Sequence, residues 1–285
     1  MNALKAKKNI VWNFADTAPL LSFEEVHTVC QQSKCPNRSE CSSQKSATFL
    51  IAGDLCTRNC AFCHVHAGKP LSIEALKEKE TSAILSAVSK LNMKYVVLTS
   101  VTRDDSEKEL ANYFAFLVKK LNQAGCLVEV LIPDFHAKEE FLKIITEASP
   151  AVIAHNIETV SRLSKKMRPQ ADYQTSLLTL KKIKEISGHI ITKSSFMTGL
   201  GENNEDINQL LIDLKEANVD ILMIGQYLRP SEKQAIVKKN YTEQEFNILR
   251  EKANKMGFLH TEAGTFVRSS YKAREVFLKL TKKQR

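Results

Sequence analysis

The 285-residue sequence lacks any long hydrophobic stretch. No run of about 18 apolar residues appears, as a transmembrane helix would need, and no apolar segment follows the lysine-bearing start MNALKAKKN, as in a secretory signal. The sequence therefore predicts neither membrane insertion nor export, and the cytoplasm is the expected location.

Aromatic residues are also few, at 7% of the chain, although the formal net charge is +9. A groove for single-stranded nucleic acid interleaves aromatic and basic side chains. Here the basic residues are spread along expected helices, and only the short ends AKK and TKKQR are clustered. The charge indicates an acidic partner or a solvated lysine-rich surface, and it does not favour nucleic acid.

No low-complexity linker interrupts the chain after residue 48, where short β-branched runs alternate with longer amphipathic stretches. This alternation is typical of βα units in a parallel sheet. Expected strands cover 48–53, 95–100, 127–132, 151–158, 189–197 and 220–228, with a short one at 258–263. Expected helices cover 72–91, 106–124, 137–148, 172–187, 203–217 and 242–256. The sequence predicts an α/β fold: a partial (βα)6 TIM-like barrel over 48–263, an N-terminal cysteine-bearing extension at 1–47, and a C-terminal tail at 264–285 that closes over the site.

Polar side chains follow each expected strand, where the functional residues of βα barrels gather. They are Thr99, Ser100, Arg103, Asp104, Asp105, Asp134, Asn156, Glu158, Ser194, Ser195, Gln226, Tyr227 and Arg229. Single members have structural explanations, such as capping of the next helix by Asp104 and Asp105. Their shared position predicts a site at this rim.

The cysteines are not dispersed as in a small secreted protein, because six of the seven lie between positions 30 and 63. Clustering in a reducing compartment favours metal or cluster binding over disulfides. The six form two triads, Cys30, Cys35 and Cys41 in VCQQSKCPNRSEC and Cys56, Cys60 and Cys63 in GDLCTRNCAFCH. The seventh, Cys126, lies beside an expected strand and is expected in the core.

Neither triad contains a fourth cysteine, although structural metal sites normally have four ligands. The spacing C-x3-C-x2-C of the second triad allows three thiolates to hold a cubane cluster and leaves its fourth iron open to a small molecule. Zinc is the competing interpretation, with His64 or His66 as the fourth ligand. The paired CxxC spacing of zinc ribbons is absent, so the sequence favours the open cluster.

These motifs resemble a known family. C-x3-C-x2-C after the first strand of a βα barrel is similar to the radical S-adenosylmethionine superfamily, and GDLCTRNCAFC resembles the lipoyl synthases within it. CQQSKCPNRSEC, LTSVTRDD, VEVLIPDF, HNIETVSRL, MRP, YLRP and RSSY agree with that family too. The resemblance runs from about His27 to Ala273.

The resemblance implies two four-iron, four-sulfur clusters and S-adenosylmethionine as cofactors. The first cluster would be held by Cys56, Cys60 and Cys63, and its open iron would bind S-adenosylmethionine for cleavage to a 5′-deoxyadenosyl radical. The second would be held by Cys30, Cys35, Cys41 and the hydroxyl of Ser270. Position at the rim and resemblance together suggest four contacts of S-adenosylmethionine: Asn156, Glu158, Arg168 and Ser194.

The implied activity is insertion of two sulfur atoms, at C6 and C8 of an octanoyl chain on a lysine of a lipoyl carrier domain, with the second cluster as sulfur donor. The implied carrier is the glycine cleavage H protein or the E2 subunit of a 2-oxoacid dehydrogenase. An electron donor such as ferredoxin or flavodoxin and an iron–sulfur carrier protein are implied as well. An unactivated C–H bond offers no acidic proton, so the cofactor must supply the reactivity.

Three other functions stay open at this point. One is another sulfur-inserting enzyme of the superfamily, biotin-synthase-like or tRNA-methylthiolating, against which the RSSY element stands. A second is a lipoyl-synthase-like enzyme for a different acyl carrier. The third is a non-catalytic iron–sulfur sensor or electron carrier, which needs neither an open iron nor a polar rim.

Overall fold

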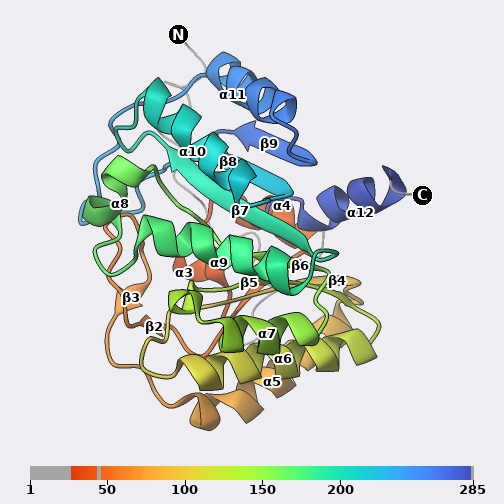
Figure 1. Cartoon of the computed structure of the whole chain (residues 1–285). Helices are drawn as coiled ribbons and strands as arrows, with labels where there is room; N and C mark the ends of the chain where they lie inside the picture. The colour runs from red at the N-terminus through yellow and green to blue at the C-terminus, as the bar shows by residue number, and fades with distance from the viewer. Residues whose placement is uncertain (1–26, 44–45, 284–285) are drawn as a thin grey trace.

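The computed structural model describes residues 27–43 and 46–283 (Figure 1). Seven strands form one parallel sheet in the order β1-β4-β5-β6-β7-β8-β9. They are β1 Thr48–Ile51, β4 Tyr95–Ser100, β5 Leu127–Leu131, β6 Val152–Ala154, β7 Ile191–Thr198, β8 Ile221–Gln226 and β9 His260–Gly264. The α/β partial barrel is therefore confirmed, with the short strand near 258–263 as its seventh. The first 26 residues of the predicted extension lie outside the described residues.

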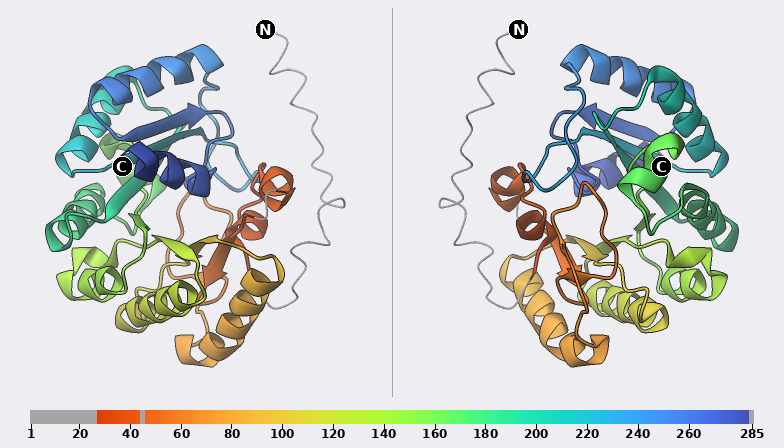
Figure 2. Two further views of the ribbon diagram at one scale, coloured as in Figure 1. Left: turned by 90° about the vertical axis from the view of Figure 1, so that its right-hand side faces the viewer. Right: turned by 90° about the vertical axis from the view of Figure 1, so that its left-hand side faces the viewer.

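Helices alternate with the strands and surround the sheet on its outer side (Figure 2). They are α5 Ile73–Lys90, α6 Glu107–Gln123, α7 Glu139–Glu147, α8 Ser161–Met167, α9 Tyr173–Ile186, α10 Asn204–Glu216 and α11 Glu243–Lys255. Capping boxes at Asn203 and Thr242 begin α10 and α11. Helix α8 was not predicted, because two turns are too short to show a periodic pattern. Of the described helices, none is long and apolar enough to cross a membrane.

The two edges of the sheet are β1 and β9, so the barrel has an open side. Thr28 covers the outer edge of β1 through an antiparallel bridge to Phe49. Two short helices follow it, α3 (Val29–Gln32) and α4 (Arg38–Ser43). Asn37, between them, donates from Nδ2 to the carbonyl oxygen of Phe266 in the tail at 2.6 Å. The N-terminal segment and the tail therefore meet at this open side (Figure 2).

The C-terminal helix α12 (Ala273–Lys283) lies against the amino ends of the strands. Its apolar side chains Val276 and Leu280 pack among the first residues of β6, β7 and β8. The ring of Phe277 lies 5.8 Å from that of Tyr95, the first residue of β4. Helix α12 therefore closes the amino end of the barrel, and only the segment before it reaches the rim at the carboxyl ends.

A buried ion pair occupies the barrel interior above α12. Lys193 Nζ lies 2.9 Å from Glu129 Oε1, and both side chains are 1% exposed. The hydroxyl of Tyr95 donates to the second oxygen of Glu129 at 2.8 Å. A buried charge pair costs stability unless its hydrogen bonds are satisfied, and here both carboxylate oxygens have donors. The interior face of β7 is therefore the face that carries Lys193.

Candidate functional site

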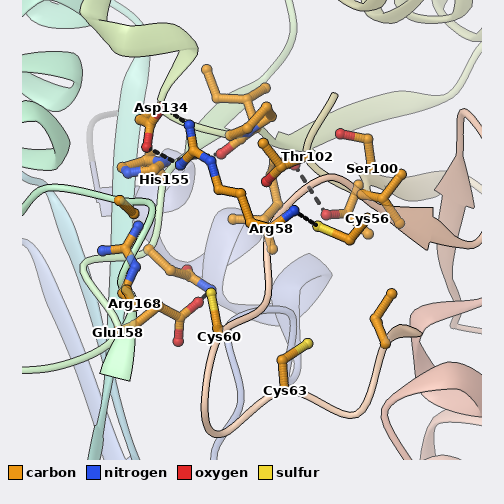
Figure 3. A pocket seen from close by; sticks show the side chains of 18 of the residues that line it. Cys56, Arg58, Cys60, Cys63, Ser100, Thr102, Asp134, His155, Glu158 and Arg168 are labelled. Atoms are coloured by element: carbon orange, nitrogen blue, oxygen red, sulfur yellow. Dashed lines mark hydrogen bonds and ion pairs between the residues drawn. The ribbon is translucent and has the colours of Figure 1, made fainter. Parts of the chain in front are cut away.

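A cavity of about 250 Å³ lies where the strands of the barrel end (Figure 3). Its walls come from the loop after β1 and from the ends of β4, β5 and β6. Its polar and sulfur-bearing lining residues include Cys56, Arg58, Cys60, Cys63, Thr99, Ser100, Asp134, His155, Asn156, Glu158 and Arg168. The structure thus brings together many of the residues that the sequence predicts at one rim.

The first triad, Cys56, Cys60 and Cys63, lines this cavity from a single loop. Two short strands that pair in parallel flank the loop: β2 (Leu55–Cys56) at its start and β3 (His66–Ala67) after its end. All three thiols are free. Burial raises the pKa of Cys60 to about 12 and that of Cys63 to about 11. Thiolates therefore require a positive ion among the three sulfur atoms, so this donor set fits a metal cluster.

Arg58, between the first two cysteines of the loop, ties the loop to the barrel. Its guanidinium is 5% exposed and pairs with both carboxylate oxygens of Asp134 at the end of β5, one of them at 2.8 Å from Nη2. The same group donates to Asp104 after β4, at 2.8 Å from Nε and 2.7 Å from Nη2. Burial alone would raise the pKa of Asp134, but the hydrogen bonds and charge of Arg58 outweigh it and lower that pKa.

The two aspartates after β4 do not cap the following helix. Asp104 pairs with Arg58, and Asp105 pairs with Arg103 through two hydrogen bonds of 2.9 Å. The N-cap position of α6 is held by Ser106. Both aspartates therefore fix arginines near the loop of the first triad.

Three of the four predicted cofactor contacts, Asn156, Glu158 and Arg168, line the first cavity. Asn156 Nδ2 donates to Glu158 Oε1 at 3.0 Å. Burial raises the pKa of Glu158, and the charge of Arg168 opposes this rise. Arg168 donates from Nη1 to the carbonyl oxygen of Ile157 at 3.0 Å. It is buried, so it is not a solvated charge at the end of α8.

Ser194, the fourth predicted contact, does not line the cavity. Its fully buried hydroxyl accepts a hydrogen bond from the Ile157 N–H at 3.2 Å. Side chains alternate between the two faces of a strand, so Ser194 shares a face with Phe196, which packs among the helices. Lys193 and Ser195 share the opposite, interior face.

His155 is a cavity residue that the sequence analysis missed. Its Nδ1 lies 2.9 Å from the carbonyl oxygen of Ile132, which can only accept, so Nδ1 carries a proton. Burial lowers the pKa of His155 to about 4, and the ring is therefore neutral. Nε2 is left as an acceptor without a partner in the part of the chain that the structure describes. Its place directly before Asn156, as the first residue of the motif HNIETVSRL, was the signal that could have found it.

The second triad, Cys30, Cys35 and Cys41, lines a smaller cavity of about 20 Å³ together with Ser270. This cavity lies at the amino end of β1, where Thr48 donates from Oγ1 to Ser270 Oγ at 2.8 Å. Burial, followed by the neighbouring thiols, raises the pKa of Cys30 to about 11 and that of Cys41 to about 12. As in the first triad, thiolates here require a positive ion. The structure therefore places the four predicted ligands of the second cluster around one cavity.

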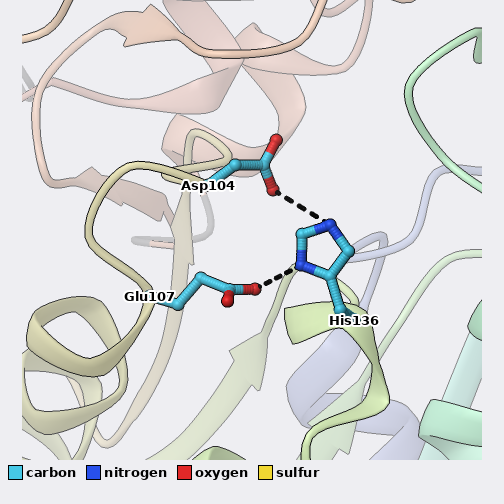
Figure 4. A group of neighbouring side chains, drawn as sticks. All are labelled: Asp104, Glu107 and His136. Atoms are coloured by element: carbon cyan, nitrogen blue, oxygen red, sulfur yellow. Dashed lines mark hydrogen bonds and ion pairs between the residues drawn. The ribbon is translucent and has the colours of Figure 1, made fainter.

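Asp104, Glu107 and His136 form a further group of possible metal ligands (Figure 4). His136 Nδ1 lies 2.7 Å from Glu107 Oε1, and Nε2 lies 3.9 Å from Asp104 Oδ1. Glu107 also pairs with Lys138 at 2.6 Å, and Asp104 pairs with Arg58. Because both carboxylates already have cationic partners, ion pairing accounts for this group. Cys126, outside all these groups, is buried in the core as predicted.

Comparison with known proteins agrees with this geometry. The model of the radical SAM superfamily matches residues 50–214, more than half of the chain. The lipoyl synthase of Koribacter versatilis (strain Ellin345) is 43% identical over 274 residues, which cover 95% of this chain and 89% of that protein. The lipoyl synthase of Caldanaerobacter subterraneus subsp. tengcongensis is 45% identical over 249 residues, 87% of each chain. The chain belongs to the lipoyl synthase family. The family, the enzyme class and the iron–sulfur chemistry expected from the motifs are thereby confirmed.

Solved structures support the fold of this member of the lipoyl synthase family. Methylornithine synthase aligns with a TM-score of 0.56 at 20% identity, covering 75% of this chain and 63% of that one. HydG, a hydrogenase maturase, aligns with a TM-score of 0.60 at 17% identity, covering 82% and 54%. Likeness at such identity concerns the fold alone. Membership of the radical SAM superfamily implies S-adenosylmethionine and one four-iron, four-sulfur cluster as cofactors.

Proposed function

We propose that the chain inserts sulfur at C6 and C8 of an octanoyl group carried on a lysine of a lipoyl carrier domain. The observation that carries the proposal is the pair of cysteine triads, each lining its own cavity, with Ser270 as a fourth donor beside the second triad. A sensor or electron carrier has no use for a cavity beside an incompletely ligated cluster. The relatives with 43–45% identity over most of the chain are lipoyl synthases, which supports the same reaction.

In this proposal, Cys56, Cys60 and Cys63 hold the cluster that binds S-adenosylmethionine. Together these cofactors supply a 5′-deoxyadenosyl radical, which can break an unactivated C–H bond. The chain contributes a loop fixed by Arg58 and a cavity wall that is largely buried. The zinc alternative gains no support, because neither His64 nor His66 lines the cavity with the three cysteines.

The second cluster, held by Cys30, Cys35, Cys41 and Ser270, is the proposed sulfur donor. A serine oxygen is a harder ligand than a thiolate, which suits an iron that must be released when sulfur is consumed. The hydroxyl of Thr48 donates to Ser270 Oγ and favours the deprotonated form that would bind iron.

Asn156, Glu158 and Arg168 are the proposed contacts of S-adenosylmethionine. They line the cavity beside the first triad and offer an amide, a carboxylate and a guanidinium. These groups match the hydroxyl, ammonium and carboxylate groups of the cofactor. The buried position of Ser194 does not support the same role for that residue.

The proposed carrier is the glycine cleavage H protein or the E2 subunit of a 2-oxoacid dehydrogenase. An electron donor such as ferredoxin or flavodoxin and an iron–sulfur carrier protein are proposed as well, because the reaction consumes electrons and a cluster. We also propose a cytoplasmic location, because six clustered thiols need a reducing compartment. Residues 1–47 and 264–285 would supply the second cluster site, and residues 48–263 the first.

Anaerobic reconstitution tests this function. The protein is loaded with iron and sulfide, reduced, and mixed with S-adenosylmethionine and an octanoyl-lysine peptide. About eight irons per chain, four for each cluster, and a dithiolated peptide in the mass spectrum are the expected results. Deoxyadenosine without thiolation would point to another acyl substrate. Electron transfer without formation of deoxyadenosine would contradict the enzymatic function and support an electron carrier.

A further inference from the structure

Ser269 connects the surroundings of the two cavities through one hydrogen bond. Its hydroxyl donates to Asn156 Oδ1 at 2.9 Å, across 113 positions of the sequence. Asn156 lines the first cavity, whereas Ser270, the residue after Ser269, lines the second. Two neighbouring residues, with Cα atoms about 3.8 Å apart, therefore contact both sites.

The contacts of Asn156 fix the orientation of its amide group. Nδ2 donates to Glu158 Oε1 at 3.0 Å, and Oδ1 accepts from the Ser269 hydroxyl, so both ends of the amide have partners. The amide oxygen is thus the atom that faces Ser269. The chain of hydrogen bonds ends at Glu158, which lines the first cavity together with Cys60 and Cys63.

The neighbours of Ser269 make different contacts. Ser270 accepts from Thr48 at the second cavity, and Arg268 donates from Nη1 to the carbonyl oxygen of Val267 at 2.6 Å. The hydroxyl of Tyr271 donates to Glu40 at 3.2 Å. The contacts of Ser270 and Tyr271 hold the tail near the second triad and that of Arg268 stays within the tail, whereas the side chain of Ser269 reaches Asn156 beyond the end of β6.

We propose that Ser269 is a positioning residue of the S-adenosylmethionine site, which orients the Asn156 amide and makes cofactor binding depend on the docked tail. The inference rests on the proposed function, in which Asn156 and Glu158 contact the cofactor. Coupling between two binding events is reciprocal, so bound cofactor also holds the tail, and with it Ser270, at the second cavity. The serine ligand then stays in place while the cofactor is bound.

The test compares reconstituted wild type with Ser269→Ala, using S-adenosylhomocysteine as a probe that cannot be cleaved to a radical. Loss of one hydrogen bond predicts roughly fivefold weaker probe binding in Ser269→Ala, with unchanged iron content. Ser269→Thr keeps the hydroxyl and is the matched control, with affinity close to wild type. The probe should also slow hydrogen exchange in residues 265–283 of wild type and Ser269→Thr, but not of Ser269→Ala.

Equal affinities of wild type and Ser269→Ala overturn the inference, and so does equal slowing of exchange in all three proteins. Loss of iron from Ser269→Ala also overturns it, because Ser269 would then act at the second cluster. If the reconstituted wild type does not bind S-adenosylhomocysteine, the result contradicts both the inference and the proposed function. If the coupling is observed but the octanoyl peptide is never thiolated, the inference stands and the proposed substrate falls.

Discussion

The two triads each offer three cysteine thiols, but their surroundings differ. The first lies on a loop that Arg58 ties to two further strands through Asp104 and Asp134, beside a cavity of about 250 Å³. The second lies on and between two short helices outside the sheet, around a cavity of about 20 Å³. The barrel thus preorganises the loop of the first triad, whereas the position of the second triad depends on contacts between the N-terminal segment and the tail.

The largest effect should come from removing one cysteine of each triad. Cys60→Ala is expected to abolish both 5′-deoxyadenosine and thiolated product, because it removes a proposed ligand of the cluster that would activate the cofactor. Cys41→Ala, its matched control, should keep deoxyadenosine formation and lose the dithiolated product. Chromatography of deoxyadenosine and mass spectrometry of the peptide measure both. A normal rate of deoxyadenosine formation in Cys60→Ala would contradict the assignment of the first triad.

Removal of the Arg58 side chain should break the bracing of the first triad. Arg58→Ala leaves Asp134, whose side chain is 2% exposed, as a buried carboxylate without its cation. Breaking a buried pair in this way costs about 3–5 kcal/mol. Arg162→Ala is the control: its pair with Asp206 is exposed at the arginine and should contribute little to stability. Denaturant unfolding measures both, and equal losses would show that Arg58 has no special role.

Cluster binding should change the second triad more than the first. A cavity of about 20 Å³ holds little more than one water molecule, so residues 30–41 must rearrange to admit a four-iron cluster. Hydrogen exchange before and after reconstitution is expected to change more in residues 28–43 than in residues 55–67. Similar changes in both segments would show that the first triad is no more preorganised than the second.

The smallest effect concerns His155. His155→Asn can keep a donor to the Ile132 carbonyl but removes the Nε2 acceptor, so we expect a few-fold weaker binding of S-adenosylhomocysteine. The pKa of about 4 keeps the ring neutral above pH 5, so the ratio of affinities should be equal at pH 6.5 and pH 8.5. Titration calorimetry on the reconstituted proteins measures it. An unchanged affinity would show that Nε2 does not contact the bound molecule.

The strands and long helices of the barrel were predictable from the sequence. The predicted strand at 95–100 coincides with β4, and the six predicted long helices all form. Periodicity predicts such elements because each buries one face. The contacts of the tail were not predictable: α12 packs on residues from four strands, and no local pattern encodes that packing.

The site was predictable as a list of residues but not as a set of orientations. In the sequence ITKSSFMT of β7, polar residues occupy both alternating faces, so the sequence could not show that Ser194 points away from the interior. Only the contact of Lys193 with Glu129 on another strand shows which face of β7 points to the barrel interior. His155 was missed for a related reason. Its Nε2 is an acceptor because Nδ1 donates to the carbonyl oxygen of Ile132, just after β5, and the sequence does not show this contact.

Strand β1 also acts as a spacer. It is four residues long, with the second triad's cavity at its first residue and the loop of the first triad after its last. Four residues of extended chain measure about 13 Å, and each inserted or deleted residue would change that length by about 3.3 Å. In the proposed reaction, C6 and C8 of the acyl chain, with C7 between them, must each meet a radical and then a sulfide, which leaves little tolerance for such steps. The length of β1 therefore sets the spacing between the two proposed cluster sites, and an insertion in this strand should disturb the reaction more than an insertion in an exposed loop.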